Sequence, residues 1–226
     1  MKKYEFTGET KTVSFLFEDV TLHRIQAITS FASVVAGELG GWIEKEENLS
    51  HKGDAWVSEN AAVYGDAVVS GNAWVSENAA VYGDAVVSGN AWVSGNAVVS
   101  ENAEVSGNAW VSENAVVSGN AWVSENAVVS ENAEVSGNAW VSENAVVSEN
   151  AEVFSVRHVL VIGPIGSRNA FTTFYHDKDN EITVQCGCFI GKIDKFLEKV
   201  AQTYGDSKYA QVYRKAVELA KLQIDL

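Results

Sequence analysis

Apolar and polar positions recur with a period of six residues between Asp54 and Val153. A valine stands at all 17 positions from Val57 to Val153 in steps of six, and an alanine stands two residues before each valine. Because residues two apart on a strand point to the same side, each hexad predicts a short strand with its alanine and valine facing inward. The Gly or Glu and the Asn or Asp that follow predict a turn, since Gly and Asn tolerate the left-handed backbone region.

Strands this short cannot bury their valines alone, so we expect consecutive hexads to form coils that stack through backbone hydrogen bonds. The order of valine, a small or polar residue, two variable residues and alanine resembles the hexapeptide repeat of left-handed parallel β-helices. The resemblance implies three hexads per coil, so the 17 hexads make between five and six coils. At about 4.8 Å per coil the triangular prism is roughly 27 Å long.

Stacking at intervals of 18 residues places four tryptophans in one outward column: Trp56, Trp74, Trp92 and Trp110. Stacked indoles stabilise a sheet, but this does not explain why they face outward. Together they present as much apolar surface as the largest patch on an ordinary monomer. We therefore predict that a partner covers this face, most simply a second copy, and assign the four tryptophans to a homo-oligomer interface.

Charge is concentrated in the repeats. The chain has 30 acidic and 16 basic side chains, and residues 54–153 hold 14 of the acids and no Lys or Arg, so the repeats carry the whole net charge of −14. This excess disfavours direct binding of nucleic acid. One corner stacks glutamates, which favours a solvated acidic edge that prevents aggregation. The alternatives are an acidic imitation of DNA and a ladder of divalent cations, although one column does not converge on a cation. The stacked residues are Glu59, Glu77, Glu113, Glu131 and Glu149.

The first fifty residues predict a small β cap. Val13, Phe15 and Phe17 share one side of an expected strand. Ile43 and Leu49 lie six residues apart and resemble degenerate hexad valines. A solenoid must close its open end to protect its core, and this segment is suited to do so.

The last seventy residues predict a compact α+β domain. An apolar strand at 159–162 precedes a hairpin whose strands, 170–176 and 181–189, alternate about a polar turn. A helix over 193–204 ends at Gly205.

A second helix is expected to follow, with Asp206 as its cap. Its inward residues are predicted to include Tyr209, Tyr213, Ala216 and Leu219. The sequence therefore predicts a mainly β protein with a β cap over residues 1–42, a left-handed parallel β-helix over 43–155 and an α+β domain over 156–226.

A glycine-rich segment of the C-terminal domain is a candidate anion-binding loop. Gly163 and Gly166 would let backbone N–H groups approach an oxyanion, while Ser167 and Arg168 offer a hydroxyl and a bidentate guanidinium. Tyr175 or Phe171 would stack on a base. The alternative is an ordinary strand-ending turn with a surface arginine. If the helices pack beside the loop, three further cations would enlarge the basic region: Lys192, Lys195 and Arg214.

No metal, cofactor or catalytic residue is predicted. Cys186 and Cys188 share an expected strand face with Ile182 and Val184, which predicts buried core thiols. His158 and His176 lack a recognisable ligand spacing for zinc. Acyl- and nucleotidyltransferases that resemble this prism generally use a coil-borne histidine and basic groups at the coenzyme. Residues 54–153 contain no His, Lys or Arg, so the repeats predict a scaffold.

The two flanks together resemble phage- and prophage-encoded hexapeptide-repeat proteins of Gram-positive bacteria. This resemblance implies an origin and not a mechanism. The residues that carry it are Tyr4–Thr10, Leu39–Glu44, Ile162–Arg168, Thr173–Tyr175 and Cys186–Phe189.

These observations favour a non-enzymatic phage-type protein: a scaffold that sequesters an anionic, nucleotide-like ligand and so counteracts host defence. The alternatives are an acidic DNA mimic that inhibits a host nucleic-acid-binding protein, and a hexapeptide-type acyltransferase. Two cysteines are too few for a disulfide framework, and no apolar leader is visible. No apolar run approaches the roughly 18 residues of a membrane span. We expect a location in the cytoplasm, that of the host cell if the protein is phage-encoded.

Overall fold

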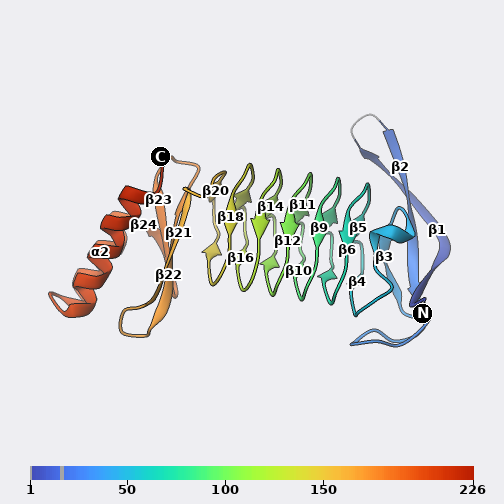
Figure 1. Ribbon diagram of the computed structural model, residues 1–226, viewed down its shortest axis with the longest axis horizontal. Coiled ribbons are helices and arrows are strands. Elements are labelled where there is room, and N and C mark those ends of the chain that lie inside the picture. Colours follow the sequence, from blue (N-terminus) through green and yellow to red (C-terminus); the bar gives the residue numbers. More distant parts are fainter. Residues whose placement is uncertain (1, 16–17) are drawn as a thin grey trace.

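The computed structural model describes residues 2–15 and 18–226, so Phe17 of the expected cap strand lies outside it. The molecule is elongated, with a β hairpin at one end, a parallel β-solenoid along the middle and a sheet with two helices at the other end (Figure 1). Mainly β character, three hexads per coil and both terminal regions are thus confirmed.

Three parallel faces build the solenoid, and each of its strands is two residues long. The first face consists of β4 (Trp56–Val57), β7 (Trp74–Val75), β10 (Trp92–Val93), β13 (Trp110–Val111), β16 (Val128–Val129) and β19 (Val146–Val147). The second consists of β5 (Ala62–Val63), β8 (Ala80–Val81), β11 (Val98–Val99), β14 (Val116–Val117), β17 (Glu134–Val135) and β20 (Glu152–Val153). The third consists of β6 (Val68–Val69), β9 (Val86–Val87), β12 (Glu104–Val105), β15 (Trp122–Val123) and β18 (Trp140–Val141).

Stacked coils are in register at intervals of 18 residues. Trp92, for example, pairs with Trp74 on one side and Trp110 on the other. The hexad alanines and valines fill the interior and are at most 1% exposed. Burying the alanine and valine of every hexad is what stabilises strands that could not exist singly.

The corners differ from the expectation in one respect. The residue with positive φ is the Gly or Glu of each corner. The Asn that follows it does not adopt this conformation, and its side-chain amide forms hydrogen bonds between coils. Asn72 donates to Asn90, and Asn90 to Asn108, each over 2.9 Å. These amide ladders explain why asparagine recurs at the corners, since each amide can both donate and accept.

The N-terminal cap continues the second face. Strands β1 (Tyr4–Phe15) and β2 (Glu18–Ala27) are antiparallel, and β3 (Leu39–Ile43) joins β2 to β5 of the solenoid. A short 3-10 helix, η1 (Glu46–Asn48), follows. Ile43 pairs with Val63, and Leu49 pairs with Val69, so both residues occupy degenerate hexad positions as predicted.

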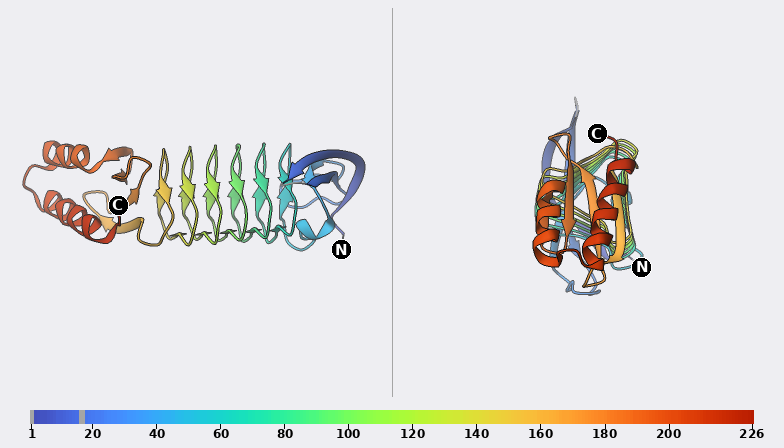
Figure 2. Two further views of the ribbon diagram at one scale, coloured as in Figure 1. Left: turned by 90° about the horizontal axis from the view of Figure 1, so that it is seen from above. Right: turned by 90° about the vertical axis from the view of Figure 1, so that its left-hand side faces the viewer.

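The C-terminal domain closes the other end of the solenoid. Four antiparallel strands form its sheet: β21 (Val159–Ile165), β22 (Ala170–His176), β23 (Ile182–Cys186) and β24 (Phe189–Lys192). Helices α1 (Ile193–Tyr204) and α2 (Lys208–Gln223) form the outermost layer, on the side of the sheet away from the solenoid (Figure 2). Successive residues of β22 face opposite sides of the sheet. Tyr175 packs against the solenoid core, and Phe174 packs against the helices.

One strand and one helix cap of this domain differ from the predictions. The strand expected over 181–189 is two strands, because Gly187 has positive φ and opens a two-residue turn with Cys188. The cap of α2 is Ser207, whose hydroxyl accepts from the Ala210 N–H, and not Asp206.

Tyr209 and Leu219 are about half exposed, at 45% and 49%. The inward stripe of α2 is built on Ala210, Ala216 and Ala220, whose small side chains permit close packing. Within the described part of the chain, neither helix combines the length and the apolar character that a membrane-crossing helix needs.

Candidate functional site

The predicted anion loop is a hairpin turn between β21 and β22. Gly166, Ser167 and Arg168 lie in this turn, whereas Gly163 lies within β21. Gly166 has a φ of +73°, and a Cβ there would lie 1.9 Å from the Tyr213 hydroxyl oxygen. Glycine suits position 166 because of this positive φ and because the Tyr213 side chain of α2 occupies the space beside it.

Gly163 and Tyr175 do not join the site that was predicted for them. At Gly163 a Cβ would lie 2.6 Å from a ring carbon of Phe171, so this glycine accommodates a neighbouring side chain. Tyr175 is wholly buried against the solenoid, and this burial raises its pKa to about 12. The prediction that Tyr175 stacks on a ligand base is wrong, because its ring has no solvent-facing side.

The turn does form one wall of a cleft. Its other walls are the Gly187–Cys188 turn and the facing sides of α1 and α2, and it encloses about 160 Å³. The lining residues are Arg168, Ala170, Cys186, Gly187, Cys188, Phe189, Phe196, Lys199, Val200, Thr203, Tyr204 and Tyr213.

Hydroxyl groups are arranged around the cleft. The Ser167 hydroxyl and the Tyr204 hydroxyl are hydrogen-bonded over 2.9 Å. The Cys186 thiol lies 3.9 Å from the Tyr213 hydroxyl. Burial, and then the neighbouring Cys186, raise the pKa of Tyr213, while Arg168 acts in the opposite direction. Tyr213 therefore keeps its proton at neutral pH and can donate it in a hydrogen bond.

Two cations line the cleft. In the described part of the chain, neither Arg168 nor Lys199 lies within ion-pair distance of a carboxylate. Lys199 was missed from the sequence. Its signal is helical spacing, since Phe196, Lys199 and Thr203 are three and four residues apart and share one side of α1.

The three cations expected to enlarge the basic region have other partners. Lys192 pairs with Asp177 over 2.6 Å, Lys195 with Glu198 over 2.9 Å, and Arg214 with Asp206 over 3.4 Å. None of the three lines the cleft. That part of the prediction is wrong, because each positive charge is already neutralised nearby.

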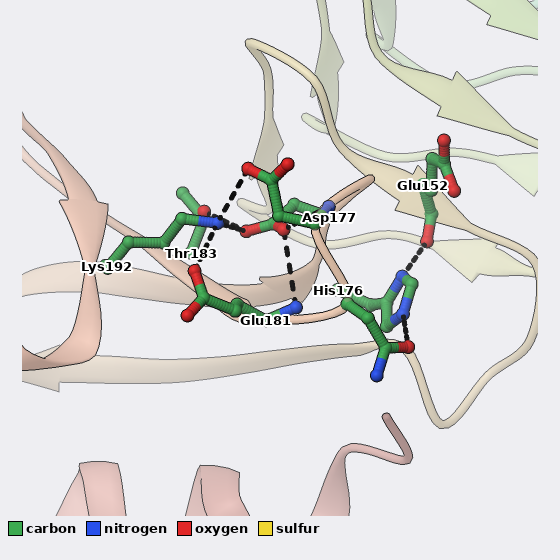
Figure 3. Close-up of polar contacts among 8 residues, drawn as sticks. Glu152, His176, Asp177, Glu181, Thr183 and Lys192 are labelled. Atoms are coloured by element: carbon green, nitrogen blue, oxygen red, sulfur yellow. Dashed lines mark hydrogen bonds and ion pairs between the residues drawn. The ribbon is translucent and has the colours of Figure 1, made fainter.

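Lys192 is the centre of a separate polar cluster at the junction with the solenoid (Figure 3). Its ammonium group also lies 3.4 Å from Asp179 and 2.9 Å from Glu181. Burial opposes the charge of Asp177, but hydrogen bonds from Lys192 and Thr183 outweigh it and hold the pKa of Asp177 below its ordinary value. Since the charged groups of this cluster bind one another, we interpret it as stabilising the junction and not as a ligand site.

His176 fastens the same junction. Its Nδ1 lies 2.9 Å from the Glu152 carbonyl oxygen of the last coil, and its Nε2 lies 3.2 Å from the Asn180 side-chain oxygen (Figure 3). Within the described residues, no group of three or more His, Cys, Asp or Glu side chains is arranged to hold a metal ion.

The cysteines are more accessible than predicted. Cys186 is half-buried at the end of β23, and Cys188 is exposed in the following turn. The expectation of two buried core thiols is wrong because the turn at Gly187 removes Cys188 from the strand.

The predicted interface tryptophans have different environments. Trp56 is wholly buried under the cap, with its ring centre 5.5 Å from that of Phe31 and 6.4 Å from that of Tyr4. Trp74 is half-buried. Trp92 and Trp110 are 44% and 47% exposed and stack on each other at 5.5 Å. The cap thus covers one end of the column, and assembly through the rest stays a prediction.

The repeats are similar to known sequences. Residues 61–77 and 79–95 match the family described as "YdcK Beta solenoid repeat". A stretch of 76 residues is 38% identical to the "Uncharacterized acetyltransferase YdcK" of Escherichia coli strain K12. The match covers 31% of this chain and 23% of that protein, so the chain spans less than a quarter of its relative. The likeness therefore concerns YdcK-type solenoid repeats.

Proposed function

We propose that this protein is a rigid β-solenoid scaffold whose C-terminal domain binds an anionic group in the cleft between Arg168 and Lys199. The observation that carries the proposal is the pair of cations without carboxylate partners at one hollow, in a chain of net charge −14. A guanidinium group binds a carboxylate or phosphate bidentately, and an ammonium group adds a point charge. The hydroxyls of Ser167, Tyr204 and Tyr213 supply further hydrogen bonds.

The size of the cleft favours a small anionic group. A cavity of about 160 Å³ is smaller than the 300–1,000 Å³ typical of sites that enclose a whole ligand. A nucleotide-like ligand would place its phosphate in the cleft and leave its remainder outside. The resemblance to phage-encoded repeat proteins gives such capture a purpose, namely removal of an anionic signal from host defence.

We propose that the cleft binds its anionic ligand and does not catalyse a reaction. The described residues that line the cleft include Lys, Tyr and Cys side chains but no His, Asp or Glu that could activate one of them as a nucleophile. We therefore propose no catalytic residue there.

Replacement of Arg168 by alanine tests the proposal. Because a charge-assisted hydrogen bond contributes roughly 1.5–3 kcal/mol, affinity should fall tenfold or more. Calorimetric titration with inorganic phosphate, and then with a nucleoside monophosphate, measures it. Lys195→Ala is the matched control, since Lys195 lies one turn from Lys199 but pairs with Glu198. Equal affinities of the parent and the Arg168→Ala variant would contradict the proposal.

Acyl transfer is a second candidate, favoured by the name of the E. coli relative, an uncharacterized acetyltransferase. Within the matched residues 61–77 and 79–95, however, this chain has no His, Lys or Arg for a coenzyme or a general base. Titration with acetyl-coenzyme A in the same calorimeter separates the two functions. Turnover of the acyl donor that a substitution in the coils abolishes would establish the transferase instead.

A further inference from the structure

Four exposed tryptophans lie along the solenoid beside its acidic corners. Trp92 and Trp110 belong to the first face, Trp122 and Trp140 to the third, and their exposed fractions are between 42% and 52%. Six hexads place a tryptophan outward, and in five of them a glutamate follows three residues later. We call the outward tryptophans of the first face that the cap leaves accessible, together with the glutamates of the corner that follows that face, the Trp–Glu edge: Trp74, Trp92, Trp110, Glu59, Glu77 and Glu113.

No cation within the repeats balances the charge of the corner glutamates. Residues 54–153 contain no Lys or Arg, and in the described part of the chain neither Glu77 nor Glu113 takes part in an ion pair. Both have positive φ at corners where the side chain is exposed. Their negative charge is therefore directed at solvent, next to the indoles.

A groove begins at the N-terminal end of the edge. It measures about 630 Å³, and its lining includes Trp74, Trp92, Glu38, Glu59 and Glu77. Among the described residues that line the groove, Arg24 is the one cation beside these three carboxylates. Aromatic surface combined with excess negative charge suits a ligand that is extended and basic.

The protein covers one of its own outward indoles with two cationic side chains. Trp42 stands at the start of the second face, in register with Ala62. The β1–β2 hairpin lies over it, with the Lys11 ammonium 4.7 Å and the Arg24 guanidinium 5.3 Å from the ring centre. Two cationic side chains carried on extended strands thus already lie over an outward indole in this fold.

We propose that the Trp–Glu edge binds an extended basic segment of another protein, whose Arg or Lys side chains lie over the indoles and pair with the corner glutamates. Coils repeat at about 4.8 Å, and side chains on one side of an extended segment repeat at about 6.6 Å. Since a cation interacts with an aromatic ring over about 6 Å, the two spacings are compatible. This site is independent of the anion cleft.

A second copy of the chain suits the edge less well. Its solenoid would bring further glutamates and no Lys or Arg from residues 54–153. Burial of the indoles would then leave both rows of carboxylates without partners, which opposes association. Charge complementarity therefore selects a basic partner.

The test uses the full chain and a short synthetic peptide in which arginine alternates with serine. Binding is followed by calorimetry and tryptophan fluorescence, with an aspartate–serine peptide as the control ligand. In the variant Trp92→Val/Trp110→Val, affinity should fall about tenfold or more, because aromatic anchors dominate interfaces. Valine fits these positions, since Val128 and Val146 occupy the same column. Val98→Ser/Val116→Ser on the second face is the matched control and should bind like the parent.

Three results would overturn the proposal. The tryptophan variant and the parent would bind the arginine peptide equally, or the parent would bind the two peptides equally. Alternatively, light scattering would show a parent dimer that the Trp92→Val/Trp110→Val variant loses, which would make this surface a contact between copies.

Discussion

Corner glutamates are held in a backbone conformation that L-residues avoid. Eight of them have φ between 57° and 61°, where glycine occupies the equivalent corners of other coils. Left-handed backbone costs roughly 1–2 kcal/mol for a residue with a Cβ, while glycine costs only about 0.5–1 kcal/mol in lost chain entropy. Repetition of an unfavourable residue at eight corners indicates that the acidic side chains serve a purpose other than stability.

Replacing Glu113 by glycine should therefore stabilise the protein. Gly95 precedes it in the same column, so the corner accepts glycine, and the difference of the two costs predicts a gain of about 0.5–1 kcal/mol. Urea denaturation measures the change. Glu113→Gln removes the charge and keeps the strained backbone, so it separates charge repulsion from strain. Glu104→Gly, at an outward strand position of β12, should destabilise. If Glu113→Gln stabilises as much as Glu113→Gly, repulsion is the cause.

At the scale of the element, the sequence predicts what is local and repeated. Each hexad contains its own inward alanine, inward valine and corner, so the solenoid and its three faces could be predicted without knowledge of distant contacts. Gly187 is different, because its role as a turn depends on β24 pairing back with β23. The approach of Tyr213 to Gly166, and the removal of Lys192 from the basic region by Asp177, also join residues far apart in the chain. Of the walls of the cleft, therefore, only the turn that contains Arg168 could be predicted from the sequence.

The Lys192 cluster should make the junction between solenoid and sheet sensitive to acid. Lys192→Met leaves the buried Asp177 carboxylate without its cation, so stability at neutral pH should fall by roughly 1–3 kcal/mol. Lys195→Met is the control, since its exposed pair with Glu198 contributes less than about 1 kcal/mol. Thermal unfolding followed by circular dichroism measures both.

The pH dependence follows from the lowered pKa of Asp177. Its ionised form favours the folded protein, so the contribution is complete above the ordinary value of 3.8 and is lost as pH falls through the pKa of the folded state. The difference between the parent and Lys192→Met should accordingly shrink in acid. A difference that persists at a pH where Asp177 is protonated would show that the lysine stabilises the junction by packing instead.

At the scale of the whole molecule, charge is separated along the long axis. The solenoid between residues 54 and 153 carries −14, whereas the remaining residues balance 16 acids against 16 bases. The anion cleft lies beside α1 and α2, and the Trp–Glu edge lies along the solenoid. Figure 1 shows the helical layer at one end of the molecule and the solenoid along its middle. Two oppositely charged ligands would thus bind separate parts of one molecule, and the number of stacked coils sets the distance between the two sites.

This separation predicts that substitutions at one site weaken binding at that site and leave binding at the other site unchanged. Changing Glu59, Glu77 and Glu113 to Gln should leave phosphate binding unchanged but weaken binding of the arginine–serine peptide, while Arg168→Ala should do the reverse. The salt dependence distinguishes the mechanism, because exposed charges are screened over about 10 Å at an ionic strength of about 0.1 M. Peptide affinity should fall steeply with salt in the parent and much less in the glutamine variant. Calorimetry at several salt concentrations measures the binding of each of the two ligands to each of the two variants. If the glutamine variant lost phosphate binding as well, the solenoid would be acting on the cleft, and the two surfaces would have to be treated as a single coupled site.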